Sequence, residues 1–128
     1  MLRKKEKRKD SIDLSDLKIL SDVTPAKVWV NLLLLHMYKD SVGSFTLNKS
    51  KGIPSIPLED EVPEGELDFD KIINRLKVMS GLVPVIYKEP HKGEIPLMLS
   101  GTRYTANTIF VDSGDNPKCE IIMSRRKT

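Results

Sequence analysis

The histidines and the cysteine are the first residues to test for catalytic chemistry. The chain has two histidines, His36 and His91, and one cysteine, Cys119. A Cys–His nucleophile pair requires both side chains within hydrogen-bond reach, and nothing in the sequence places either histidine beside Cys119. His36 falls on an apolar helical stretch, where an imidazole is expected to pack, and His91 falls in a turn, where it is expected to face water. The three residues give no zinc-ligand set.

Acidic residues are the second group that could bind a metal or catalyse a reaction. They lack the D-x-D-x-D-G spacing of a calcium loop and lie in or beside a segment broken by prolines, which favours a solvated acidic loop. The residues in question are Glu59, Asp60, Glu61, Glu64, Glu66, Asp68 and Asp70. Asp112, Glu120 and Lys118 resemble the carboxylate pair and lysine of a nuclease site only loosely. They flank a tight turn, where surface charge is the better interpretation. The sequence therefore predicts no metal, no cofactor and no enzymatic activity.

Basic residues gather at the two ends of the chain. The net charge is +3, and residues 1–10 contain six Lys/Arg against two acids. Arg125, Arg126 and Lys127 add three more positive charges, so residues 11–124 carry a net charge of −4. Basic tails often contact phosphates, although a solubilising role is an equally good interpretation. We expect a disordered basic tail over residues 1–10 and a second basic tail over residues 125–128.

Length and composition fit a single domain, expected over residues 11–124. The chain has 128 residues, of which 39% are hydrophobic and 30% charged, enough for a core if the apolar residues are concentrated. No apolar run approaches the roughly 20 residues of a membrane span, and no apolar stretch follows the basic N-terminus as in a secretory signal. A single cysteine suits a reducing compartment, which predicts a cytoplasmic protein.

Two helices are predicted from their caps and their apolar periodicity. Thr24 is a good N-cap and Pro25 suits the first helical position. Apolar residues surround most of the helix predicted over 24–38, which is typical of a central, buried helix. Asp68 is expected to cap a second, amphipathic helix over 68–80. Its outer face is expected to carry Lys71, Asn74, Arg75 and Lys77.

The sequence between these helices predicts a short strand, 44–47, and then a proline-rich acidic loop, 48–67. Pro54, Pro57 and Pro63 forbid a regular helix there, and ordinary connections are only about 4–6 residues long. The stretch 11–20 fits either a short helix or an edge strand.

After Gly81 the apolar period changes to two, which predicts four short antiparallel strands. They are expected over 82–89, 94–100, 107–113 and 119–124, with turns at 90–93, 101–106 and 114–118. The element order predicts an α+β, winged-helix-like fold in which two main helices pack on a small antiparallel sheet of three to four strands.

These elements also carry a resemblance to a known family. Four stretches carry it, TPAKVWVNLLLLHMY, GSFTL, DFDKIINRLKVMSGLVPVIY and GEIPLMLS, and a final pair of strands follows them. Together they are similar to the first winged-helix domain of plasmid replication initiator proteins. The family's leucine-rich helix would fall on 30–35 and its short strand on 45–47. Its L-x-x-L helix would fall on 72–79 and its LLS-like strand on 97–100. The family has a short helix where this sequence has residues 48–67, and a second winged-helix domain that these 128 residues do not contain.

The resemblance implies a domain kept for dimerisation or partner contact, with DNA binding reduced or moved to the basic tails. A plasmid or viral origin would place the protein in the cytoplasm or nucleoid of a host cell.

The first functional hypothesis is a nucleic-acid-associated domain of a replication or transcription assembly. Its affinity would come from phosphate contacts made by the tails and by one face of the second helix, although any amphipathic helix also places solvated charge there. The candidate nucleic-acid-binding residues are Arg3, Lys4, Lys5, Lys7, Arg8, Lys9, Lys71, Arg75, Lys77, Lys88, Lys92, Arg125 and Arg126.

The alternative is a non-enzymatic protein-interaction or structural accessory subunit, viral or plasmid-borne. It would bind a protein partner or a second copy of itself through a strand edge or an apolar hairpin. The apolar stretches 82–86 and 121–123 are the candidate contact segments.

Overall fold

The longest helix, α2 (Pro25–Lys39), begins where its sequence signals predict. In the computed structural model, which describes residues 11–17, 24–57, 62–63 and 65–125, the hydroxyl of Thr24 accepts a hydrogen bond from the amide of Lys27 at 3.4 Å. The amide of Asp40 closes the other end by donating to the carbonyl of His36 at 2.9 Å. Apolar residues on every side of α2 are buried, which confirms the prediction of a central helix.

The second long helix, α3 (Phe69–Met79), is also confirmed. The carboxylate of Asp68 accepts the amide of Asp70 at 3.2 Å and so caps the first turn. Gly81 follows the helix with a φ of +82°, a backbone conformation that glycine adopts without strain. Ile72 and Leu76 are fully buried on the inner face.

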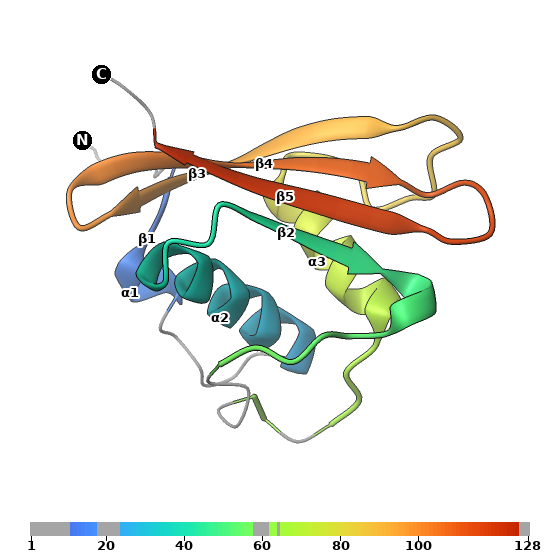
Figure 1. The fold of residues 1–128 in the computed structure, drawn as a ribbon, viewed down its shortest axis with the longest axis horizontal. Coiled ribbons are helices and arrows are strands. Elements are labelled where there is room, and N and C mark those ends of the chain that lie inside the picture. Colours follow the sequence, from blue (N-terminus) through green and yellow to red (C-terminus); the bar gives the residue numbers. More distant parts are fainter. Residues whose placement is uncertain (1–10, 18–23, 58–61, 64, 126–128) are drawn as a thin grey trace, which may run out of the picture.

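The sheet has five strands and mixed pairing. Its spatial order is β1-β3-β4-β5-β2, in which β1 runs parallel to β3 and every other pairing is antiparallel. The strands are β1 (Ile12–Asp13), β2 (Ser44–Asn48), β3 (His91–Leu99), β4 (Thr102–Val111) and β5 (Lys118–Arg125), and the short helices are α1 (Leu14–Leu17) and the 3₁₀ turn η1 (Lys49–Lys51). Figure 1 shows α2 and α3 on the same side of the sheet. The α+β class is confirmed, and the sheet is larger than the predicted three to four strands.

The strand predicted over 82–89 is wrong. This stretch is an irregular loop that leads from α3 to β3, although its run of valine, isoleucine and tyrosine is typical of a strand. Three long strands follow instead of four short ones. The predicted turns at 90–93 and 101–106 fall mostly inside β3 and β4, and β5 extends to Arg125, inside the predicted basic tail.

Two tight turns set the register of the three long strands. Ser100 and Gly101 both have positive φ, 52° and 80°, and they join Leu99 to Thr102 in a two-residue hairpin with the handedness that twisted strands require. The 114–118 turn was predicted correctly. Its Asn116 accepts the amide of Ser50 at 2.9 Å and donates to the side chain of Asn48 at 2.6 Å.

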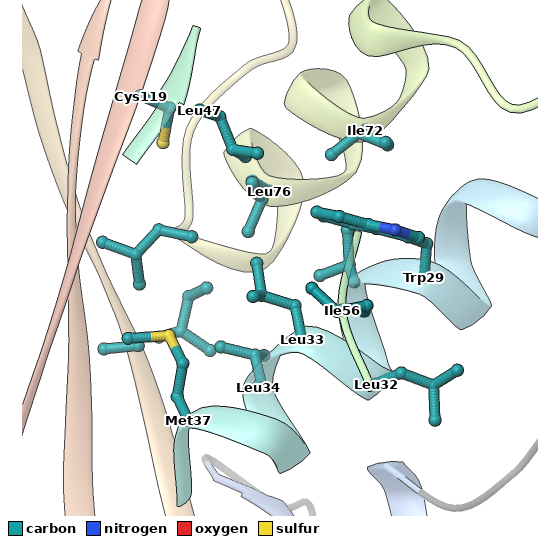
Figure 2. Packing of buried hydrophobic residues seen from close by; sticks show 14 of the residues in the cluster. Trp29, Leu32, Leu33, Leu34, Met37, Leu47, Ile56, Ile72, Leu76 and Cys119 are labelled. Atoms are coloured by element: carbon teal, nitrogen blue, oxygen red, sulfur yellow. The ribbon is translucent and has the colours of Figure 1, made fainter. Parts of the chain in front are cut away.

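The core lies between the inner face of the sheet and the two helices. Trp29, Leu33 and Leu76 are among its buried side chains, and Figure 2 shows Trp29, Ile72 and Ile56 among the packed side chains of this cluster. Ile56 comes from the proline-rich segment and is only 4% exposed. The described part of that segment therefore packs on the core in part, and the expectation of a solvated loop does not hold for Ile56. None of the described helices is long and apolar enough to span a membrane.

Candidate interaction surface

The segment between α3 and β3, residues 82–90, exposes a group of apolar side chains, and we call it the α3–β3 loop. Val83 is 63% exposed, Val85 50% and Ile86 83%, and Val78 at the end of α3 is 51% exposed. Single exposed apolar residues are common on protein surfaces, whereas large contiguous apolar patches often belong to interaction sites, so this group is the candidate interaction surface.

A buried ion pair holds this loop on the fold. The ammonium of Lys77 lies 2.7 Å from Oδ2 of Asp112 and also donates to the carbonyl of Val85 at 2.7 Å. The same carboxylate oxygen accepts the amide of Tyr87 at 2.8 Å. The side chains of Lys77 and Asp112 are 3% and 8% exposed. The pair thus joins α3, the end of β4 and the loop at one point.

Aromatic rings reinforce the attachment. The Lys77 ammonium lies 5.3 Å from the ring centroid of Tyr87 and 5.7 Å from that of Phe110, within the range of a cation–π interaction. The Tyr87 ring stacks on His91 at a centroid distance of 3.7 Å, and its hydroxyl donates to the carbonyl of Val83 at 2.8 Å. The loop therefore has a defined conformation while its apolar side chains face solvent.

Two grooves flank the loop. A groove of about 360 Å³ lies between the loop, α3 and the 117–118 turn. A second groove, of about 650 Å³, lies between α3 and the first turn of α2, and we call it the α2–α3 groove. Pro84 and Asn74 line both grooves, so the loop and the outer face of α3 form one continuous surface.

The α2–α3 groove combines an apolar lining with positive charge. Pro25, Ala26, Val78 and Pro84 supply the apolar part, and Lys27, Lys71 and Arg75 supply the cations. Lys71 forms an exposed ion pair with Glu66 at 3.3 Å.

Arg75 is the most buried of the three cations that line this groove. Its Nε is buried and has no hydrogen-bond partner among the residues that the structure describes. Desolvation by burial lowers the pKa of Arg75 from its usual value, yet a guanidinium remains charged in proteins. The groove therefore contains a partly desolvated positive charge.

Among the residues that the structure describes, two of the predicted nucleic-acid-binding residues, Lys71 and Arg75, share the α2–α3 groove. Lys77 was expected on the outer face of α3, and this is wrong, because its ammonium is buried against Asp112. A basic side chain enters the interior here because a carboxylate and a carbonyl are positioned to receive it. Arg3, Lys4, Lys5, Lys7, Arg8, Lys9 and Arg126 lie outside the described residues.

The remaining predicted cations that the structure describes are exposed. Lys88 belongs to the α3–β3 loop, and Lys92 lies on β3 opposite Ile109 of β4. Arg125 lies opposite Tyr104 at the other end of β4. Five residues of strand separate these two positions along β4, which is roughly 17 Å. Lys92 and Arg125 therefore do not join one basic patch.

The histidines and the cysteine do not meet. His91 lies opposite Phe110, which lies opposite Cys119, so two strand spacings, about 10 Å, separate His91 from Cys119. His36 contacts Asp40 at 2.6 Å. Cys119 is fully buried, and desolvation, followed by the charge of Asp112, raises its pKa to about 12. Its thiol is thus protonated at neutral pH, the opposite of an activated nucleophile.

Three of the acidic residues have structural partners, and Glu59, Asp60, Glu61 and Glu64 lie outside the described residues. Glu66 contacts Lys71, Asp68 caps α3 and Asp70 contacts Lys49 at 3.3 Å. No group of three or more potential metal-ligating side chains occurs within the described ranges. Asp112, considered above as part of a nuclease set, is the buried partner of Lys77.

Sequence reasoning missed the Lys77–Asp112 pair. The hint was the position of Lys77 four residues after Ile73, on the buried face of the helix. The acid that receives it is 35 residues away in the chain, and no local pattern links the two.

Comparison with known proteins adds no further guide. No protein-family model matches the chain, and its sequence matches no curated protein.

Proposed function

We propose that this chain is a protein-interaction domain that binds a partner through the α3–β3 loop and the adjoining face of α3. The observation that carries the proposal is the exposure of Val83, Val85 and Ile86 on a loop that a buried ion pair anchors. Exposed apolar surface is unfavourable in water, at about 25 cal/mol per Å². A partner that covers it gains this free energy without first having to order the loop.

Site-specific photo-crosslinking tests this function. A photo-reactive amino acid at position 86, introduced into the full chain in the cells that produce it, is expected to give one dominant protein adduct. The same amino acid at Ser113, an exposed position in the turn after β4, is the positional control and is expected not to give that adduct. An adduct with the mass of two chains would identify a second copy as the partner.

Surface variants complete the test. Val83→Ser with Val85→Ser should abolish the adduct from position 86, because both apolar contacts are removed. Ile122→Ser removes an exposed apolar side chain from the sheet and should leave the adduct unchanged. Equal adducts from positions 86 and 113, or an adduct that survives the loop substitutions, would refute the proposal.

The second candidate function is nucleic-acid binding by a winged-helix-like domain. Two observations favour it: β2 pairs with β5, as the short strand and the hairpin of a winged helix do, and Lys71 and Arg75 line the exposed side of α3. Fluorescence anisotropy with a labelled DNA duplex tests it. Affinity should fall steeply with salt, and deletion of residues 2–9 should weaken binding and flatten the salt dependence. Binding that is absent, or independent of salt, would exclude this function.

A further inference from the structure

We infer that the α2–α3 groove receives an acidic side chain flanked by apolar residues on a peptide segment of the partner, with Arg75 as its ion-pair partner. This inference rests on the proposed function, because it describes the chemistry of the partner that the α3–β3 loop contacts.

The shape and lining of the groove support a peptide segment. Its volume of about 650 Å³ lies within the range of small-ligand and side-chain pockets. Pro25, Ala26, Val78 and Pro84 present carbon surface to an occupant. Pro84 belongs to the α3–β3 loop, so a chain that covers Val83 and Val85 lies next to the groove.

The charges in the groove specify an acid. Lys71 has Glu66 as its neighbour, whereas Arg75 has a buried Nε without a hydrogen-bond partner in the described structure. Lys27 is exposed on the groove wall and adds a second positive charge. A carboxylate that enters the groove can accept charge-assisted hydrogen bonds from the guanidinium, which are about twice as strong as neutral ones.

A peptide carboxylate explains the lining better than a nucleic-acid phosphate does. A backbone phosphate carries no apolar neighbour suited to Ala26, Val78 and Pro84, which form the carbon lining of the groove. An isolated Glu or Asp between apolar side chains matches both parts of the lining. Binding of a nucleic acid here is therefore an alternative outcome of the experiment.

Chemical-shift changes of the full ¹⁵N-labelled chain, measured by nuclear magnetic resonance, test the inference. Two capped peptides are added, acetyl-Ser-Leu-Glu-Leu-Ser-amide and the same peptide with glutamine in place of glutamate. Inorganic phosphate and a short DNA duplex are the comparison probes. The Glu peptide should shift the signals of Lys27, Arg75 and Val78. It should also bind about tenfold more tightly than the Gln peptide, because a charge-assisted hydrogen bond is stronger than a neutral one by roughly that factor in affinity. Arg75→Gln should remove this difference and Arg75→Lys should keep part of it. Lys92→Gln, on β3, is the matched control and should change nothing.

The result that overturns the inference is equal binding of the two peptides, shifts confined to another surface, or no shift with either peptide. Shifts of the same residues by phosphate and DNA alone would overturn it in favour of a nucleic acid. Crosslinking from position 86 separates this failure from failure of the proposed function. A partner adduct that forms equally well with Arg75→Gln would leave the interaction domain in place and refute the acidic recognition alone.

Discussion

Replacement of Lys77 by methionine tests the physical basis of the interaction surface. Methionine approximates the length of the lysine stem but supplies no ammonium. The carboxylate of Asp112, whose side chain is 8% exposed, would retain the amide of Tyr87 and lose its counter-charge. The carbonyl of Val85 would lose its donor. Removal of one partner from a buried ion pair typically costs about 3–5 kcal/mol.

Local opening limits this cost. The α3–β3 loop is exposed on its outer side, so it can detach and admit water to Asp112 without unfolding of the core. We therefore expect Lys77→Met to lower the free energy of unfolding by about 2–4 kcal/mol. Amide hydrogen exchange of residues 85–87 should accelerate by a larger factor than exchange in α2.

Chemical denaturation measures the first effect, and the single tryptophan, Trp29, provides the signal because it is 1% exposed in the folded state. Lys71→Met is the matched control. It removes a surface lysine that pairs with Glu66, and the two side chains are 54% and 75% exposed. It should therefore lower the free energy of unfolding by roughly 0–1 kcal/mol. The double variant Lys77→Met/Asp112→Leu removes both buried charges and should be more stable than Lys77→Met alone. Equal effects of Lys77→Met and Lys71→Met, with unchanged exchange in the loop, would refute this account.

Three further predictions follow from the packing and from the buried thiol. Leu33→Ala, at a fully buried position of α2, should lower the free energy of unfolding by about 2–5 kcal/mol, whereas Ile86→Ala should change it by less than about 0.5 kcal/mol; similar costs would mean that the loop belongs to the core. Gly93→Ala would place a Cβ 2.5 Å from the Cβ of Ser80 and should cost about 1–3 kcal/mol in denaturant unfolding, whereas Gly43→Ala has open space and serves as the neutral control. Burial raises the pKa of Cys119 to about 12 from the 9.0 of an exposed thiol, so the unfolded chain loses this proton first and folding stability should fall by up to about 1.4 kcal/mol per pH unit between pH 9 and 12. Cys119→Ala should lack this component in urea titrations across that range, and identical pH profiles would contradict the burial effect.

Local signals in the sequence determined the two long helices and the α+β class. Thr24, Pro25 and Asp68 predicted the helix starts because capping depends on residues within one turn. The all-round apolar pattern of 24–38 predicted a central helix because such a surface must be covered on every side. The strand at 44–47 and the turn at 114–118 were also predictable from local patterns.

Only the tertiary structure decided that a lysine, Lys77, is buried. It also decided that the apolar residues Val83, Val85 and Ile86 are exposed. Residues 82–89 are rich in side chains that favour strands, but a strand needs a hydrogen-bonding neighbour. This stretch is an irregular loop attached through Lys77 and Asp112. The burial of Lys77 depends on a carboxylate that another part of the chain brings to it. Contacts between residues far apart in the chain leave no periodic trace in a single sequence. The interaction surface proposed for this protein is therefore a product of packing, whereas its helices are a product of local sequence.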